Sequence, residues 1–178
     1  MVSLPDFRPA NLLKTLASAG VDFVLIGGVA VVMQASPRFT GDVDVCFATD
    51  AANLERLGEV LLALGAKLRG VEEDLPFVPD ARTLRHAQML TLTTAEGNLD
   101  LLIDPPGSPG YAALRRRADV VELGGARIRV AAVEDLIAMK RAAGRPQDAI
   151  DVEALEIARS RTRGVRTRPP DTDAASSS

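Results

Sequence analysis

Two aspartates one residue apart lie within an apolar, strand-like run, and this pattern limits how the chain can fold. The run Gly41-Asp42-Val43-Asp44-Val45 alternates carboxylates with valines. Residues i and i+2 of a strand point to the same face, so the two aspartates share one face and the two valines face the core. Placing a carboxylate beside an apolar core costs free energy unless its charge is compensated. The sequence therefore predicts a strand with a functional polar face.

A third aspartate occupies a similar place further along the chain. Asp100 lies between two leucines at the start of another apolar run, and a neighbouring strand could bring it next to Asp42 and Asp44. Three converging carboxylates repel one another, and Mg²⁺, which prefers oxygen ligands and is usually shared with substrate phosphates, would relieve that repulsion. The alternative is that Asp42 caps the strand, Asp44 pairs with Arg38, and Asp100 lies on an exposed face.

A pair of glycines, Gly27-Gly28, follows the short apolar run Val21–Ile26 and precedes a predicted helix. Backbone N–H groups at the start of a helix bind phosphate groups. Glycine has no Cβ, so the backbone at this turn can approach a ligand closely. The sequence therefore predicts a phosphate-binding turn in front of the two aspartates.

Composition limits the class of protein. The 178 residues suit one domain, and with 47% hydrophobic but only 3% aromatic residues the core must be aliphatic. The single cysteine, Cys46, excludes an intramolecular disulfide framework and is expected to be a small buried side chain. We find no signal-peptide pattern and no apolar run near the roughly 20 residues that span a bilayer. We expect a soluble cytoplasmic protein that does not contact a membrane.

The charge is unevenly distributed. The chain has a net charge of −3, but residues 1–109 carry 8 basic and 14 acidic side chains, whereas residues 110–168 carry 13 basic and 8 acidic ones. The acidic part contains the three aspartates. The basic part, including Arg115-Arg116-Arg117, could contact a polyanion such as RNA, or its arginines could simply be solvated.

Hydrophobic periodicity predicts an α/β or α+β fold with a mixed central sheet flanked by helices, although pattern alone does not order the strands. We expect a domain over residues 1–160, a disordered tail over 161–178, and a loop with at most one edge strand over 66–83. Helices are predicted over residues 9–19, 29–34, 53–64, 111–117, 133–143 and 147–159, and strands over 21–26, 42–47, 87–94, 99–103, 120–123 and 126–130.

Together these motifs resemble the nucleotidyltransferase superfamily related to DNA polymerase beta. The chain looks most like its small bacterial AbiEii-type group, which includes toxins of toxin–antitoxin pairs, and the resemblance spans residues 10–157. Many relatives have Gly-Ser where this chain has Gly27-Gly28, so one hydroxyl contact to phosphate is lost. The matching segments are Ile26-Gly27-Gly28, Arg38-Phe39-Thr40-Gly41, Asp42-Val43-Asp44-Val45, Leu99-Asp100-Leu101 and residues 133–140 and 145–151.

The resemblance implies an Mg²⁺-dependent enzyme that moves a nucleotide from an NTP such as ATP to a hydroxyl acceptor on tRNA or protein. It also implies an antitoxin partner. Asp42 and Asp44 would hold two Mg²⁺ ions, while Asp100 would complete one metal site and help to activate the acceptor hydroxyl. The nucleotide-binding residues that it implies are Gly27, Gly28, Arg38, Thr40 and Lys140.

Several assignments stay open at this stage. Arg38 could contact a phosphate or form a salt bridge with Asp42 or Asp44. Lys140 could reach the nucleotide from an apolar helix face, or it could be a surface lysine whose stem alone is covered.

Three other polar residues carry weaker expectations. Asp148 and Asp151 share one helix face and could orient Lys140 or Arg145, but the pattern favours a solvated face. His86 is the only histidine, so with one cysteine in the chain we expect no zinc site and a structural role for His86.

Two other classes of function fit the same motifs. One is a non-catalytic, partner-binding protein of the same fold. The other is an aminoglycoside-type nucleotidyltransferase that acts on a small cationic molecule, for which Glu72-Glu73-Asp74 could provide an acidic pocket.

Overall fold

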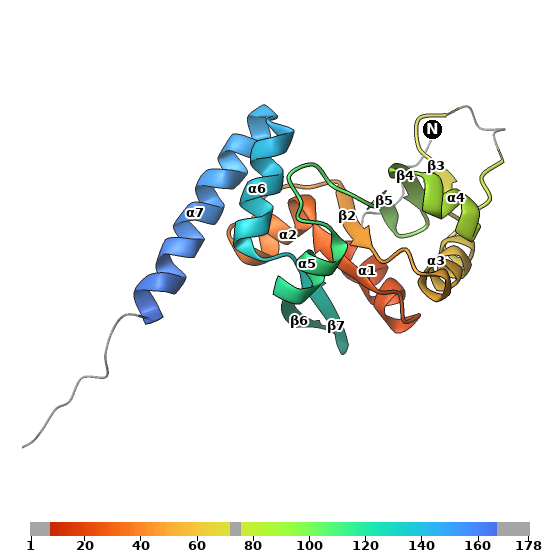
Figure 1. Cartoon of the computed structure of the whole chain (residues 1–178), viewed down its shortest axis with the longest axis horizontal. Coiled ribbons are helices and arrows are strands. Elements are labelled where there is room, and N and C mark those ends of the chain that lie inside the picture. Colours follow the sequence, from red (N-terminus) through yellow and green to blue (C-terminus); the bar gives the residue numbers. More distant parts are fainter. Residues whose placement is uncertain (1–7, 72–75, 167–178) are drawn as a thin grey trace, which may run out of the picture.

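A mixed sheet lies at the centre of the computed structural model, which describes residues 8–71 and 76–166 (Figure 1). The strand order within these residues is β3-β4-β5-β2-β1-β7-β6. The predicted α/β fold with a mixed central sheet is therefore confirmed. The elements are α1 (Pro9–Ser18), β1 (Phe23–Ile26), α2 (Gly27–Gln34), β2 (Asp42–Phe47), α3 (Ala51–Ala63), β3 (Lys67–Leu68), α4 (Ala81–His86), β4 (Met89–Thr94), β5 (Gly97–Leu102), α5 (Tyr111–Arg117), β6 (Asp119–Leu123), β7 (Ala126–Val130), α6 (Val133–Ala143) and α7 (Pro146–Arg166).

The middle of the sheet is formed by β1, β2 and β5. All four residues of β1 are buried, as expected for a continuous apolar run in a central strand. β1 pairs antiparallel with β2, which places Ile26 opposite Asp44, and β2 pairs parallel with β5, which places Asp44 opposite Asp100. Strand pairing thus aligns two of the aspartates at the edge where β1 ends.

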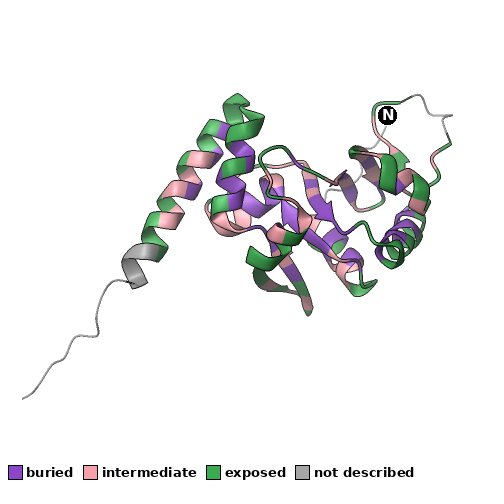
Figure 2. Ribbon diagram, in the orientation of Figure 1, coloured by how far each residue is buried: buried purple, intermediate pink, exposed green. Residues whose placement is uncertain are grey.

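Aliphatic side chains fill the space between this sheet and its helices, and buried positions gather on the strands and on the helix faces that cover them (Figure 2). Helix α3 shows the pattern clearly, because Leu54, Leu57 and Leu61 recur at helical spacing and are fully buried. Asp50 caps its first turn, accepting a hydrogen bond from the Asn53 N–H at 3.0 Å.

Residues 66–83 contain more regular structure than the sequence predicted. The edge strand is present as β3, but the six-residue helix α4 was not predicted. Its signals are slight: Asp80 caps it by accepting a hydrogen bond from the Thr83 N–H at 2.7 Å, and Leu84 is its one buried side chain. One apolar residue in a single turn shows no periodicity from which a helix could be inferred.

Helix α7 continues to Arg166, beyond the end at residue 159 that the sequence suggested. It lies beside α6 and extends away from the sheet (Figure 1). Residues 167–178, which make up most of the predicted disordered tail, lie outside the described residues. In the described ranges, no helix combines the length and the apolar character that crossing a membrane requires.

Candidate active site

One cavity of about 660 Å³ is lined by every residue that the sequence singled out for catalysis, metal binding or nucleotide binding. We call it the carboxylate cavity. It lies where α2 and β2 begin, with α6 and α7 on its other side. The predicted residues along its wall are Gly27, Gly28, Arg38, Thr40, Asp42, Asp44, Asp100 and Lys140.

The three aspartates converge on this cavity, and their charges are incompletely compensated. Val43 and Val45 are buried on the opposite face of β2, as the strand alternation predicted. Burial, reinforced by the negative charges of Asp100 and Asp42, raises the pKa of Asp44 to about 6. Burial also raises the pKa of Asp100, which Arg69 partly offsets. The cavity therefore favours protons or cations near these oxygens.

Arg69 supplies an internal cation that the sequence analysis missed. Its Nη1 lies 2.9 Å from Asp42 Oδ1 and its Nη2 lies 2.7 Å from Asp100 Oδ1. The backbone N–H of Arg69 donates to the carbonyl of Thr91, so the residue extends the edge strand alongside β4. No local pattern reveals this pairing, because Arg69 reaches the aspartates only once β3, β4 and β5 lie side by side.

The donor set suits Mg²⁺. In the part of the chain that the structure describes, no three acidic, histidine or cysteine side chains form a ready-made metal site. The Arg69 guanidinium lies between two of the carboxylates and compensates them instead. Hard carboxylate oxygens are nevertheless the ligands that Mg²⁺ prefers, and Arg69 relieves the repulsion among these three only in part. The residues present therefore fit a divalent cation that displaces the arginine.

The two glycines allow close contacts that a side chain would prevent. Gly27 has φ +67°, and a Cβ at this position would overlap the carboxylate of Asp44. The N–H of Gly28 donates a hydrogen bond to Asp44, which offsets a small part of the rise in the pKa of this aspartate. A Cβ on Gly28 would lie 2.5 Å from Thr40 Oγ1 and 2.8 Å from Arg38 Nη2. Thr40 and Arg38 thus fill the space that a serine at position 28 would need.

Arg38 does not pair with the carboxylates of β2. Its Nε lies 2.7 Å from Asp151 Oδ1, its Nη2 donates to Asp151 Oδ2 at 2.9 Å, and its Nη1 donates to the carbonyl of Phe39. The alternative salt bridge to Asp42 or Asp44 is therefore wrong. The ion pair with Asp151 instead fixes the arginine at the cavity wall.

Lys140 is buried rather than placed at the surface, so the surface-lysine alternative is wrong. Its Nζ lies 3.0 Å from Asp148 Oδ1 and 2.9 Å from Asp151 Oδ2, and all three side chains are less than a tenth exposed. The favoured interpretation of the two aspartates as a solvated face is wrong as well. They face a cation contributed by the neighbouring helix, and these contacts join α6 to α7.

Two further residues at the cavity were not predicted as site residues. Arg145 contacts Asp148 at 2.8 Å, while its side chain stays 70% exposed and lines the cavity. Burial raises the pKa of Asp148, but the hydrogen bonds from Arg145 and Lys140 outweigh that effect and lower it to about 2. Phe39 lies on the same wall and is 91% exposed, which is unusual for an aromatic side chain in a chain with few aromatics.

Other residues considered in the sequence lie apart from the cavity. His86 is exposed at the end of α4. Cys46 is fully buried, and burial together with the charge of Asp104 raises the pKa of its thiol to about 12, which makes it unreactive. The acidic segment Glu72-Glu73-Asp74 lies outside the described residues.

Comparison with known proteins agrees with the geometry of the cavity, because the matching family is one of nucleotidyltransferases. Residues 11–162 match the model of the family described as "Nucleotidyl transferase AbiEii toxin, Type IV TA system". No curated protein matches the chain.

Two solved structures share the fold. The lincosamide antibiotic adenylyltransferase LnuA, determined with lincomycin bound, aligns with a TM-score of 0.56 at 17% identity over 82% of this chain and 92% of its own. An antigenic nucleotidyltransferase-like protein from Paracoccidioides brasiliensis aligns with a TM-score of 0.51 at 17% identity over 89% of this chain and 86% of its own.

Proposed function

The chain belongs to the AbiEii nucleotidyltransferase toxin family, and on that basis we propose that it transfers a nucleotide from an NTP to a hydroxyl group of RNA or protein with the help of Mg²⁺. The observation that supports this most strongly is the alignment of Asp44 with Asp100 beside Asp42, in a cavity that begins at a glycine turn. Its oxygen donors suit a cation, and its backbone N–H groups suit a phosphate.

Asp42, Asp44 and Asp100 would hold the metal, as two ions if this chain follows the superfamily pattern. The raised pKa of Asp44 supports this role, because bound metal would replace the proton or the arginine that now compensates the carboxylates. Mg²⁺, when bound, would neutralise charge on the phosphates and on the acceptor oxygen.

The chain's own residues would position the nucleotide. Gly27 and Gly28 would bring the backbone against the triphosphate, and the Thr40 hydroxyl, which lies above Gly28, would provide the contact that a serine provides in many relatives. Arg38 and Lys140 would add positive charge from positions fixed by buried aspartates. Phosphoryl-group chemistry depends mainly on such positioning and charge compensation.

In the transfer step the acceptor oxygen would form a bond to the α-phosphorus, and the bond between the α-phosphorus and the bridging oxygen would break to release pyrophosphate. The acceptor proton would pass to Asp100, which lies opposite Asp44 and lines the same cavity. The family description also supports an antitoxin as a partner of this protein.

The test is incubation of the purified protein with each α-³²P-labelled NTP, Mg²⁺ and one of three acceptor pools: total RNA, cell protein, or a panel of aminoglycosides and lincomycin. Asp42→Asn/Asp44→Asn is compared with Asp104→Asn, which changes an exposed aspartate that does not line the carboxylate cavity. We expect label on RNA or protein with the wild type and Asp104→Asn, and none with the double variant.

The other results would contradict specific parts of the proposal. Equal labelling by the double variant would refute the assignment of the carboxylates. Labelling of the antibiotics alone would refute a macromolecular acceptor. The absence of label with every NTP and every acceptor pool would refute the proposed transfer.

A further inference from the structure

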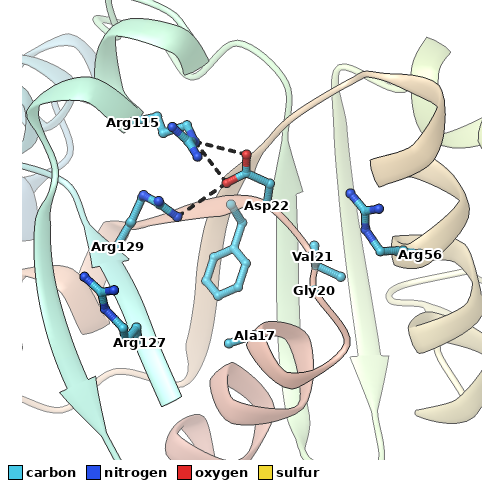
Figure 3. Close-up of a pocket in the computed structure, with 9 residues that line it drawn as sticks. Ala17, Gly20, Val21, Asp22, Arg56, Arg115, Arg127 and Arg129 are labelled. Atoms are coloured by element: carbon cyan, nitrogen blue, oxygen red, sulfur yellow. Dashed lines mark hydrogen bonds and ion pairs between the residues drawn. The ribbon is translucent and has the colours of Figure 1, made fainter.

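A second cavity, of about 350 Å³, lies at the end of β1 opposite to the carboxylate cavity (Figure 3). Strand β1 begins at Phe23, which lines this second cavity, and ends next to Gly27, which lines the first. Four arginines from three separate elements surround it, and we call it the arginine pocket. They are Arg56 of α3, Arg115 of α5, and Arg127 and Arg129 of β7.

A single acidic side chain lines this pocket, and it compensates only part of the positive charge. Asp22 accepts two hydrogen bonds from Arg115 Nε, at 3.2 and 3.0 Å, and lies 3.6 Å from Arg129 Nη1. Arg56 and Arg127 form no ion pair within the described ranges 8–71 and 76–166. Two guanidinium groups without an ion pair therefore lie beside this cavity, in a chain whose overall charge is negative. The nearest acidic residue in the register of β6 and β7 is Glu122, which lies opposite Arg127 but forms no ion pair with it.

The base of the pocket is held in place by a buried polar side chain. Asn53 is fully buried; its Oδ1 accepts from the Asp22 N–H at 2.7 Å, and its Nδ2 donates to the carbonyls of Asp22 and Ala48 at 3.1 and 2.7 Å. On the other side of the pocket, the aliphatic part of the Arg56 side chain packs over Gly20. Its Cδ lies 3.6 Å from the position that a Cβ on Gly20 would take. Arg56 thus lies across the cavity from the two arginines of β7 (Figure 3).

We propose that the arginine pocket binds a phosphate-type oxyanion. Guanidinium groups present forked donors that match phosphate oxygens, and several of them directed at one cavity are the usual means of phosphate recognition. The volume falls at the lower end of the range of about 300–1,000 Å³ that is typical of small-ligand sites. The anion is either a free polyphosphate or a phosphate group of a polynucleotide.

This site is separate from the proposed nucleotidyl transfer. None of its lining residues lines the carboxylate cavity, and the pocket lies at the other end of β1. Binding at the arginine pocket can therefore be measured without Mg²⁺ and without turnover, so its failure would say nothing about the transfer reaction.

The test measures two probes in EDTA: inorganic tripolyphosphate by calorimetry and a fluorescein-labelled single-stranded RNA by anisotropy. Arg56→Ala/Arg127→Ala removes the two unpaired guanidinium groups, and Arg82→Ala/Arg85→Ala removes two exposed arginines of α4 as a charge-matched control. We expect the pocket variant to weaken binding of at least one probe about tenfold or more, because each charge-assisted contact to phosphate is worth that much. The control variant should change binding by less than about twofold.

The two probes distinguish the sources of the anion. Weaker binding of both probes identifies a general phosphate site, and weaker binding of RNA alone identifies a polynucleotide; in the latter case the salt dependence of RNA binding should also become shallower. Arg56→Lys/Arg127→Lys should recover part of the affinity, because it keeps the charge but loses the fork. Equal losses in the pocket and control variants, or no binding of either probe by the wild type, would overturn the proposal.

Discussion

The two ends of β1 have opposite charges, and they differ in how those charges are compensated. In the carboxylate cavity, Asp42 and Asp100 share Arg69, while Asp148 and Asp151 share Lys140. In the arginine pocket Asp22 pairs with two arginines, and the other two arginines form no ion pair among the described residues. The first site satisfies most of its charge internally, whereas the second leaves positive charge available to an external anion.

The charged side chains of the two sites also differ in how deeply they are buried. The ion pairs of Lys140 with Asp148 and Asp151 are almost completely buried, whereas Arg56 and Arg127 of the pocket are exposed. Removing one partner of a buried pair leaves an uncompensated charge in a poorly solvated environment, but removing an exposed charge costs little. Substitutions at the first site should therefore change stability, and substitutions at the second should change ligand affinity.

The largest expected effect comes from Lys140→Ala. It leaves Asp148 and Asp151 buried with less compensation, so we expect the free energy of unfolding to fall by about 3–5 kcal/mol. The neighbouring pair Arg141–Glu156 also joins α6 to α7, at 2.6 Å, but is more exposed, so Arg141→Ala should cost less than about 1 kcal/mol. Urea unfolding measures the free energy of unfolding of both variants. Equal losses would contradict the proposed difference between a buried and an exposed ion pair.

The next largest effect is the dependence of stability on pH that Asp44 causes. Burial and the charges of Asp100 and Asp42 raise its pKa from 3.8 to about 6 in the folded chain, so between these values the folded protein keeps a proton that the unfolded chain releases. Wild-type stability should therefore fall as pH rises through this window, relative to Asp44→Asn.

Without metal, Asp44→Asn should be more stable than the wild type by about 2–3 kcal/mol above pH 6, and the difference should disappear towards about pH 4. Unfolding at a series of pH values in EDTA measures the difference. Added Mg²⁺ should narrow it, because a bound cation stabilises the ionised aspartate. A difference that stays constant with pH would contradict the charged environment described for Asp44.

A smaller effect is expected for Arg69→Ala. Because Arg69 contacts the same carboxylates that would bind metal, its removal should strengthen Mg²⁺ binding about tenfold, equivalent to about 1.4 kcal/mol. Calorimetric titration of Mg²⁺ without nucleotide measures this affinity, with Arg82→Ala as the control for loss of one exposed arginine. Weaker or unchanged Mg²⁺ binding would show that the arginine does not compete with metal.

The smallest effect is expected at the arginine pocket. Asp22→Asn removes the negative charge that holds Arg115 and Arg129, so the affinity of the pocket for tripolyphosphate should rise about threefold. Calorimetry in EDTA measures the change. Weaker binding would mean that Asp22 is needed to orient the arginines rather than competing with the anion.

Strong local patterns predicted much of the fold. The alternation of aspartate and valine predicted β2 over Asp42–Phe47, and the helices over Tyr111–Arg117 and Val133–Ala143 were also predicted with the bounds that the structure shows. Helix α6 ends before Gly144, which has φ +64°, a conformation that glycine adopts without strain.

Features that depend on distant partners were not predictable in the same way. The contacts of Arg69 require three strands in register, and no local pattern specifies that register. The i, i+3 spacing of Asp148 and Asp151 fits a solvated helix face as well as a buried one, and only the packing of α6 against α7 decides between them. The residues predicted for the site line one cavity, while their catalytic and binding roles stay predictions.

The most direct test of the central claim is the binding of a nucleotide that cannot react. Each of the four α,β-methylene nucleoside triphosphates is titrated calorimetrically into the wild type, Asp44→Asn and Asp104→Asn, with Mg²⁺ and with EDTA. The account predicts that the wild type and Asp104→Asn bind at least one analogue more tightly with Mg²⁺, and that Asp44→Asn loses this dependence. Equal binding by Asp44→Asn, or no effect of Mg²⁺ on the wild type, would contradict it.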